Sequence, residues 1–394
     1  MKKKICFLIQ RYGLEVNGGA ELLCRQFAEL LNDVYDVHVY TSKAIDYMTW
    51  RDYYPNELEQ LNGVTIHRFS VKKERKQEEF DEINSRFMQG LMPRTEEQKW
   101  VDIQGPYMPD MLESIKANRD EYDVFVFFTY LYYQTVMGVP LVADKAIVVP
   151  FAHDEPFMRI SLYDKVFNNP RAFLFSTDEE RQLIRNKYHN YNIPYKLGGA
   201  GVDVPVDVSS QRFKEKYGLD KYILYIGRID EGKNCDELFD FFVRFKKNNP
   251  SDLKLVLMGK AVIDVPKRDD IIELGFVSEQ DKYDGLAGAQ LLVLPSKYES
   301  LSIVVLEAFS LNIPVIVNGA CEVLKAHCEK SKAGFYYKGY WGFESKILQL
   351  LNSAELRQSM GKLGYKYVKE NYQWNIIKKK FVALIDDVIA DSEE

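Results

Sequence analysis

The sequence lacks any apolar run close to the roughly 20 residues that a helix needs to cross a lipid bilayer. We therefore expect a protein that does not span a membrane. Its N-terminal segment, MKKKICFLIQ, joins basic residues to an apolar run of five residues, Ile5 to Ile9. Such a run is too short for the core of a signal peptide, and it predicts a first buried strand instead.

Cysteine is scarce, scattered and without any Cys-x-x-Cys spacing. The five cysteines are Cys6, Cys24, Cys235, Cys321 and Cys328. An odd, dispersed set favours a reduced, cytoplasmic protein over a disulfide framework. Cys321, His327 and Cys328 are residue types that zinc accepts, but no second pair accompanies them, so we expect no metal there.

An excess of basic residues is also missing. Lys and Arg number 52 against 58 Asp and Glu, a net charge of -6, which argues against a nucleic-acid-binding surface. Two basic clusters, Val71–Lys76 (VKKERK) and Ile376–Phe381 (IIKKKF), could contact the anionic inner face of the cell membrane. Solvated helix faces explain both clusters as well, and we favour that interpretation.

The chain, at 394 residues, is long enough for two or three domains of roughly 150 residues each. Short apolar runs alternate with amphipathic stretches, the βαβ rhythm of a parallel sheet covered by helices. The first series of expected strands is 4–9, 35–41, 63–69, 122–128, 146–151 and 172–177. The rhythm restarts after a Gly- and Pro-containing linker at 198–210, with expected strands at 221–228, 253–259, 271–277, 289–296 and 313–319.

Two stretches stand outside this rhythm. Residues 71–111 are long, charged and expected to be helical, and they could shape a binding pocket or simply elaborate the surface. The last stretch, WNIIKKKFVALIDDVIAD, predicts an amphipathic helix that ends the protein.

Ligands of open parallel sheets bind beyond the carboxyl ends of the strands, so the loops at those ends are the candidate sites. The first such loop, residues 10–21, carries Gly18 and Gly19 just before a predicted helix. Glycines there let a ligand approach the backbone N–H groups, where the helix dipole favours anions. A plain glycine-rich turn is the alternative, and the G-x-G-x-x-G dinucleotide spacing is absent.

The equivalent loop of the second series, GRIDEGKN (227–234), carries Arg228 and Lys233. The Arg fork and the Lys point charge beside a helix start suit a doubly anionic group such as a diphosphate. A surface salt bridge to Asp230 or Glu231 is the alternative. In FAHDEP (151–156), His153 follows a predicted strand and can be either structural or catalytic.

The stretch SKYESLSIVVLEAFS (296–310) holds Glu299 and Glu307 on either side of an apolar run. We expect Glu299 in the loop after a strand and Glu307 in the next helix, with Ile303, Val304, Leu306 and Phe309 packed inward and Glu307 facing elsewhere. The helix start, Leu301 to Val304, would present backbone N–H groups to an anion, and the carboxylates would accept hydrogen bonds from hydroxyls. A nucleotide sugar satisfies all these groups.

These residues resemble the retaining family 4 glycosyltransferases of GT-B fold. The similar motifs are GRIDEGKN, LVLMGK, LPSKYESLSIVVLEAFSLNIPVIVNG, YQWNIIKKKF, NGGAE and HDEP. Glu299 and Glu307 meet the Glu-x7-Glu signature, and the likeness covers nearly the whole chain except about 71–120. Many members have Glu-Gly-Phe-Gly where this chain has Glu299-Ser300-Leu301-Ser302. The loss of both glycines changes how closely a donor approaches and leaves the donor's identity open.

The resemblance implies two facing Rossmann-like, doubly wound α/β domains with a cleft between them. Residues 1–200 would form the acceptor-side domain and 201–374 the nucleotide-sugar donor domain, with the helix 375–394 packing back on the first. The catalytic residues would be Glu299, His153, Arg228 and Lys233. The donor-binding residues would be Gly18, Gly19, Arg228, Lys233, Glu299, Leu301, Ser302, Ile303 and Glu307.

The implied reaction is a hexosyl transfer from a UDP- or GDP-sugar to a glycan or lipid-linked acceptor, in surface polysaccharide synthesis. Cations and a helix start can stabilise the leaving diphosphate without a metal, and no Asp-x-Asp follows a predicted strand, so we expect neither metal nor cofactor. A non-catalytic nucleotide-sugar-binding or scaffold protein of the same fold is the alternative. A glycoside hydrolase would leave Arg228 and Lys233 unexplained, and a Rossmann dehydrogenase would need the missing glycine fingerprint.

Overall fold

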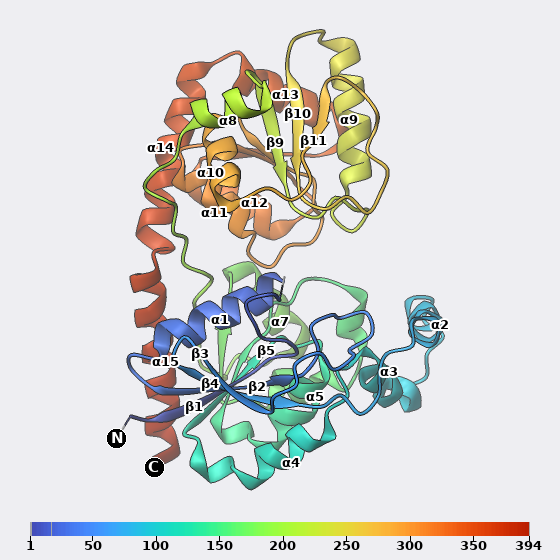
Figure 1. Ribbon diagram of the computed structural model, residues 1–394, viewed down its shortest axis with the longest axis vertical. Coiled ribbons are helices and arrows are strands. Elements are labelled where there is room, and N and C mark those ends of the chain that lie inside the picture. Colours follow the sequence, from blue (N-terminus) through green and yellow to red (C-terminus); the bar gives the residue numbers. More distant parts are fainter. Residues whose placement is uncertain (1, 17, 394) are drawn as a thin grey trace. The chain divides into compact units, whose positions relative to one another are not determined.

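The computed structural model describes residues 2–16 and 18–393, and the chain divides into two compact units (Figure 1). The first comprises Met1–Gly199 with Lys378–Glu394, and the second comprises Ala200–Ile377. Asn17 of the predicted NGGAE loop lies outside the described residues, as does Glu394 at the end of the predicted last helix. We describe each unit by itself.

The described part of the first unit contains an eight-stranded sheet with the order β3-β4-β2-β1-β5-β6-β7-β8. All neighbours pair in parallel except β3, which runs antiparallel to β4. The central strands β1 and β5 are apolar and almost wholly buried, as expected when helices cover both faces. The strands are β1 (Lys4–Leu8), β2 (Asp36–Ser42), β3 (Leu58–Leu61), β4 (Val64–Phe69), β5 (Val124–Phe128), β6 (Ala146–Val149), β7 (Ala172–Phe175) and β8 (Tyr195–Leu197).

Helices connect these strands. They are α1 (Gly19–Leu31), α2 (Gln77–Met88), α3 (Glu97–Gln104), α4 (Pro109–Ala117), α5 (Tyr133–Gly138), α6 (Tyr163–Asn168) and α7 (Asp178–Tyr188). Short 3-10 turns are η1 (Arg94–Glu96), η2 (Arg119–Glu121), η3 (Val139–Leu141), η4 (Ala143–Lys145) and η5 (Pro156–Arg159).

The last helix, α15 (Trp374–Glu393), packs against the first unit from Lys378 onward. The Phe381 ring meets the Phe27 ring edge-on at 5.0 Å between centroids, and the Tyr35 hydroxyl donates a hydrogen bond to Asp386 at 2.7 Å. Lys378 in the IIKKKF cluster pairs with Asp33 at 2.5 Å. That basic cluster therefore lies on a helix, as we favoured.

The Val71–Lys76 cluster does not lie on a helix, and this part of the prediction was wrong. It is an irregular segment before α2, and its cations bind nearby groups. Lys72 pairs with Asp110 at 2.6 Å, while the Arg75 guanidinium donates to the Tyr47 and Ile103 carbonyls. The cluster thereby fastens this segment to the residues around it. Residues 71–111 are helical in part, split among α2, η1, α3 and the start of α4.

The second unit contains, among its described residues, a six-stranded parallel sheet with the order β11-β10-β9-β12-β13-β14. Its strands are β9 (Tyr222–Ile226), β10 (Lys254–Met258), β11 (Ile271–Glu273), β12 (Leu292–Leu294), β13 (Val315–Asn318) and β14 (Gly334–Tyr337). Its helices are α8 (Ser210–Tyr217), α9 (Cys235–Asn248), α10 (Glu279–Gly288), α11 (Ile303–Ser310), α12 (Glu322–Ser331), α13 (Gly339–Leu351) and α14 (Ala354–Asn371). Two Rossmann-like α/β units are thus confirmed.

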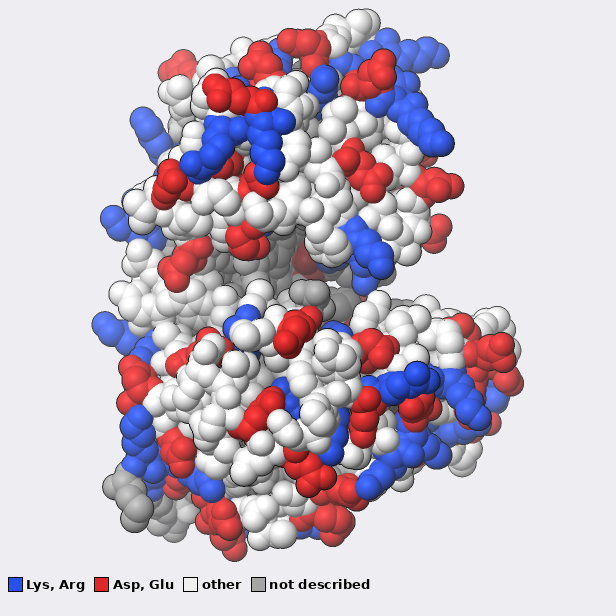
Figure 2. Space-filling model, viewed as in Figure 1, with Lys and Arg blue, Asp and Glu red and all other residues white. Residues whose placement is uncertain are grey.

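The surface carries no extended field of one sign on the face that Figure 2 shows. Lys and Arg side chains are interspersed there with Asp and Glu side chains. Among the described residues, no helix is both long and apolar enough to cross a bilayer. All five cysteines are buried free thiols.

Candidate functional site

The loop after β9 presents Arg228 and Lys233 at the carboxyl edge of the second sheet. The Asp230 carboxylate organises this loop, because it accepts the Lys233 backbone N–H at 2.7 Å and contacts the Arg228 guanidinium. The Tyr225 hydroxyl donates to the Arg228 carbonyl at 2.6 Å. The salt bridge considered as an alternative therefore exists. It leaves the Arg228 side chain 54% exposed, whereas Asp230 is 13% exposed, so the guanidinium stays accessible to a ligand.

Lys233 reaches across to the next loop. Its Nζ lies 2.7 Å from Oε1 of Glu299, which follows β12. Strands β9 and β12 are neighbours at the point where the strand order of the sheet reverses, since β10 lies on the other side of β9. Open α/β sheets bind their ligands at such a switch point. The structure thus brings two of the predicted residues into direct contact at the place where a ligand is expected.

The start of α11 has an unusual backbone. Ser302, its N-cap, adopts a left-handed conformation with φ of 64°, which a non-glycine residue rarely does. Its hydroxyl is buried and has no hydrogen-bond partner among the described residues. The side chains of Leu301 and Ser302 are buried, whereas Ile303 is half-buried. The glycine that many similar sequences have at this position therefore matches the conformation that Ser302 adopts.

His327 supports this helix start from behind, although sequence reasoning considered it only as a metal ligand. Its Nε2 lies 2.7 Å from the Leu301 carbonyl, so Nε2 carries the proton, and Nδ1 lies 3.2 Å from the Tyr367 hydroxyl. Burial lowers the pKa of His327 to about 4, and the imidazole is neutral at pH 7. Among the described residues, no group of three or more His, Cys, Asp or Glu side chains could hold a metal ion.

Glu307 corrects an expectation. We expected it to face away from the interior, but it is 7% exposed, while Ile303 and Val304 are only half-buried. Its Oε1 accepts hydrogen bonds from Lys282 Nζ at 3.0 Å and from the Tyr283 hydroxyl at 2.9 Å. A carboxylate enters an interior when it is paired in this way. Both partners lie on α10, and no motif in the sequence singled them out.

The first unit places Gly18 and Gly19 at the start of α1. Arg11 and Glu21 form a buried ion pair there, with Arg11 Nη2 2.6 Å from Glu21 Oε1. A Cβ on Gly18 would lie 2.1 Å from Glu21 Oε2, whereas a Cβ on Gly19 would meet nothing within 4 Å. The two glycines therefore differ. The absence of a side chain at Gly18 leaves room for the Glu21 carboxylate of the same helix, whereas the space beside Gly19 is open.

His153 lies in the loop after β6. Its Nε2 is 3.2 Å from Oε2 of Glu155, and the Glu155 carboxylate also contacts the Tyr130 hydroxyl. Phe151, two residues before His153, has φ of 53°. Glu180 lies behind this loop and accepts the Ala152 backbone N–H at 2.7 Å. Burial raises the pKa of Glu180 to about 7, although its hydrogen bonds and His153 act in the opposite direction.

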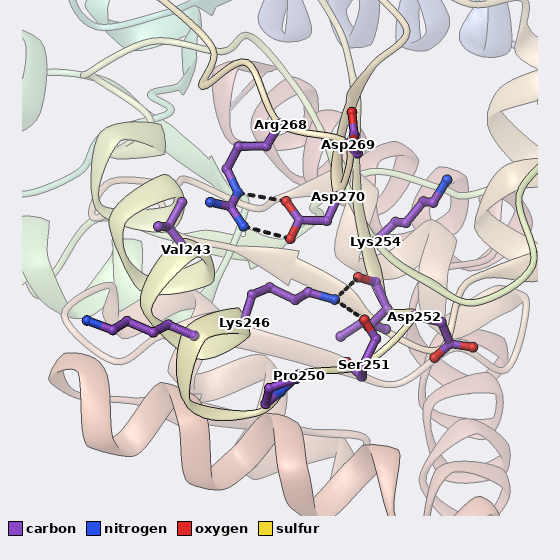
Figure 3. Close-up of a pocket in the computed structure, with 11 residues that line it drawn as sticks. Val243, Lys246, Pro250, Ser251, Asp252, Lys254, Arg268, Asp269 and Asp270 are labelled. Atoms are coloured by element: carbon purple, nitrogen blue, oxygen red, sulfur yellow. Dashed lines mark hydrogen bonds and ion pairs between the residues drawn. The ribbon is translucent and has the colours of Figure 1, made fainter.

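A surface groove of the second unit lies elsewhere (Figure 3). Its lining includes Lys246, Lys254 and Arg268, and it lies where β10 and β11 begin, at the opposite ends of the strands from the loops described above. Lys246 donates to the Ser251 and Leu253 carbonyls, and Arg268 pairs with Asp270 at 2.7 Å. These contacts explain both cations structurally, and none of the predicted site residues lines the groove.

Comparison with known proteins finds similarity to glycosyltransferases. Residues 208–367, within the second unit, match the family model described as "Glycosyl transferases group 1". An α-D-kanosaminyltransferase of Streptomyces kanamyceticus is 24% identical over 286 residues, 62% of this chain and 70% of that protein. An N-acetyl-α-D-glucosaminyl L-malate synthase of Bacillus anthracis is 25% identical over 201 residues, 46% of this chain and half of that protein.

Solved structures share the architecture of the whole chain. Sucrose-phosphate synthase from Thermosynechococcus elongatus aligns with a TM-score of 0.73 and 15% identity, covering 99% of this chain and 100% of that one. Anabaena HepE in complex with UDP and glucose aligns with a TM-score of 0.70 and 14% identity, covering 98% and 100%. The fold is GT-B. With the family match, these findings support a glycosyltransferase.

Proposed function

We propose that the protein is a retaining glycosyltransferase that moves a sugar from a UDP- or GDP-sugar to a glycan or lipid-linked acceptor without a metal ion. The observation that carries the proposal is the 2.7 Å contact between Lys233 and Glu299 at the switch point of the second sheet. It joins a cation suited to a phosphate and a carboxylate suited to sugar hydroxyls in one place. The second unit then serves as the donor domain and the first as the acceptor-side domain.

The donor diphosphate would bind Arg228, Lys233 and the backbone N–H groups at the start of α11. Charge builds up on this group as the bond between the anomeric carbon and the diphosphate oxygen breaks, and fixed cations and N–H dipoles stabilise it. The acceptor hydroxyl forms the new bond on the same face of the sugar and gives its proton to the departing diphosphate oxygen. Because these protein groups supply the positive charge, the proposed reaction needs no metal ion.

The two glutamates would bind hydroxyls. The described residues offer no hydrogen-bond partner for Glu307 Oε2, while Lys282 and Tyr283 hold Oε1. We assign Oε2 to the ribose hydroxyls of the nucleotide. Glu299 likewise uses Oε1 for Lys233, and we assign its other oxygen to the transferred sugar. Gly18, Gly19 and His153 of the first unit would then act on the sugar or the acceptor.

The names of similar proteins support the substrate classes. HepE is described in complex with UDP, glucose and UDP-glucose. A Staphylococcus aureus relative, 21% identical, is a capsular polysaccharide biosynthesis glycosyltransferase, and a Campylobacter jejuni relative, 30% identical over a quarter of this chain, acts on a diphospho-undecaprenol-linked sugar. We therefore propose a role in surface polysaccharide synthesis, in the cytoplasm and at the inner face of the membrane when the acceptor is lipid-linked.

The first test is a thermal-shift panel of UDP, GDP, ADP, CMP and dTDP, with their sugars, in EDTA. A nucleotide at about 100 times its Kd stabilises the protein by about 2.7 kcal/mol, which raises Tm by a few degrees. We expect one base to shift Tm, the shift to be lost in Glu307→Ala, and the surface variant Glu322→Ala to keep it. No shift with any nucleotide would contradict the proposal. A shift without sugar transfer to any acceptor would favour the non-catalytic binding protein.

A further inference from the structure

We propose that Glu180 is a positioning residue that ties together the loops after β6 and β7 and thereby fixes His153. This link between the two loops, which we call the tie, is a property of the first unit. Its effect on sugar transfer rests on the proposed function, because it depends on the role of His153 there. Neither the sequence motifs nor the resemblance pointed to Glu180.

The geometry of the tie is direct. Glu180 Oε1 accepts the backbone N–H of Ala152 at 2.7 Å, and Oε2 accepts the backbone N–H of Ser176 at 2.6 Å. Ala152 follows β6 and Ser176 follows β7, and these strands are parallel neighbours. One carboxylate thus bridges two adjacent loops at the carboxyl edge of the sheet. It is 1% exposed, so water does not compete for these hydrogen bonds.

The local sequence shows how a helix start provides this bridge. Thr177 is the N-cap of α7, and its hydroxyl accepts the Glu180 backbone N–H at 3.2 Å. The Thr-x-x-Glu spacing is that of a capping box, in which the glutamate returns to the N-cap N–H. Here the carboxylate reaches one residue further back, to Ser176, and its second oxygen leaves the helix for the neighbouring loop. A motif that ordinarily serves one helix therefore links two loops.

The loop that receives this hydrogen bond needs a fixed backbone. Phe151, directly before Ala152, has φ of 53°, a conformation that a bulky residue adopts only when its surroundings impose it. His153, directly after Ala152, contacts Glu155, which contacts Tyr130 in the loop after β5. The Ala152 N–H is therefore held between a strained residue and the histidine that we place in the site.

Replacement by glutamine separates this role from charge alone. A glutamine side chain has one acceptor oxygen and one NH2 donor, so it satisfies only one of the two backbone N–H groups and turns a donor toward the other. Glu179→Gln is the matched control, because it removes the same charge from the same helix start at a half-buried position. Glu180→Asp keeps the charge and both oxygens but is one methylene shorter.

The experiment is hydrogen exchange of the unliganded protein, read by mass spectrometry on peptides that contain Ala152 and Ser176. We expect exchange to be at least tenfold faster in Glu180→Gln, to be raised less in Glu180→Asp and to be unchanged in Glu179→Gln. Unchanged exchange in a folded Glu180→Gln protein would overturn the tie. If Glu180→Gln does not fold, Glu180→Asp decides the question in the same way.

Kinetics with the donor found by the thermal-shift panel then test positioning. We expect Glu180→Gln to lower kcat about tenfold at an unchanged KM for the donor, because the residues proposed to hold the diphosphate and the ribose belong to the other unit, with Glu179→Gln like wild type. A loosened loop with unchanged kcat would overturn the positioning role. A wild-type protein that transfers no sugar would overturn the proposed function instead, and the exchange result would still decide the tie.

Discussion

The two units hold their candidate residues in different ways. In the second unit the candidates contact one another or share a partner: Lys233 meets Glu299, and Asp230 holds both Arg228 and the Lys233 backbone. In the first unit, Gly18 and Gly19 lie at the start of α1, and His153 lies in the loop after β6. Buried carboxylates that the sequence did not single out, Glu21 and Glu180, shape their loops instead.

This difference reflects what each edge has to bind in the proposed reaction. A diphosphate needs positive charge, and charged side chains placed close together need partners while the site is empty. A sugar or an acceptor needs shape, which backbone conformation supplies. The candidate residues of the second unit are therefore paired charges, and those of the first unit lie in loops that buried carboxylates hold. Each of the following predictions tests one side of this contrast.

The largest effect should follow from removing a cation of the second unit. Loss of one preorganised donor costs about 3–4 kcal/mol in the barrier, so we expect Lys233→Ala and Arg228→Ala each to lower kcat by about 100-fold or more. Steady-state kinetics with the identified donor measures this. Lys247→Ala, an exposed lysine near the other end of the same helix α9, should keep full activity. Turnover of Lys233→Ala within tenfold of wild type would remove the basis for a charge-based donor site.

The two glycines of the first unit should respond in opposite ways. Gly18→Ala forces a methyl against the Glu21 carboxylate, and overpacking of this kind costs about 1–3 kcal/mol of unfolding free energy. Gly19→Ala meets open space in the first turn of α1 and should fold at least as stably as wild type. Urea unfolding measures both changes.

If Gly19 admits a ligand, Gly19→Ala should nevertheless lose activity. Full activity in Gly19→Ala would show that the space beside Gly19 is not used, and would leave Gly18 as a purely structural glycine.

The stability of the two units should also respond differently to acid. Burial lowers the pKa of His38 and of His327 to about 4, and it also lowers the pKa of His67 in the first unit. Each of these histidines therefore binds its proton less readily in the folded state than in the unfolded chain. Stability from these residues is complete above pH 6.5 and falls on acidification by about 1.4 kcal/mol per pH unit for each group. In the first unit Glu180, with a pKa raised to about 7 by burial, acts oppositely, because the folded state binds its proton more readily.

None of the described carboxyl groups of the second unit has a raised pKa. Where the pKa of a carboxyl group there is shifted, as for Asp281 and Asp284, it is lowered. The second unit should therefore lose stability through His327 as the pH falls from 6.5 to 5, without the opposing contribution that Glu180 makes in the first unit. His327→Gln should flatten this dependence in urea unfolding followed from pH 7 to 5, and His189→Gln, at an exposed position of the first unit, should not. An unchanged slope in His327→Gln would contradict the assignment of the acid sensitivity to this residue.

The smallest effect concerns Ser302. Its left-handed backbone costs about 1 kcal/mol for a residue with a side chain, and glycine relieves that cost. We expect Ser302→Gly to raise the unfolding free energy by about that amount or less, since glycine also gains entropy in the unfolded chain. If the Ser302 hydroxyl contacts the donor, KM should rise in the same variant. A destabilised Ser302→Gly protein would mean that the hydroxyl has a structural role.

Much of the fold could be predicted because buried parallel strands are short apolar runs. Every expected strand is present, from β1 to β13. The missed strands are β3, β8 and β14. β3 (LEQL) is an exposed edge strand in antiparallel pairing, and β8 (YKL) has three residues, so neither shows the apolar run that identifies a buried strand. Only pairing with a neighbouring strand defines β3 and β8.

The candidate site was predictable where it depends on loop position and less so where it depends on packing. Spacing placed Arg228, Lys233 and Glu299 in loops after strands, and the structure brings Lys233 and Glu299 together. The spacing could not show that Glu307 is buried, because its partners Lys282 and Tyr283 come from another helix. Glu180 had a readable signal in its Thr-x-x-Glu spacing, but that spacing indicates a helix start and says nothing of a second loop.

The contact between Lys233 and Glu299 has a kinetic consequence in the proposed reaction. A lysine without a partner would hold a nucleoside diphosphate most strongly after transfer, when the product carries its full negative charge. The Glu299 carboxylate, 2.7 Å from Lys233, can instead re-form its ion pair with this lysine as the product leaves. Competition of this kind weakens the binding of the product and favours its release. The same pair thus sets how soon the emptied enzyme can accept the next donor.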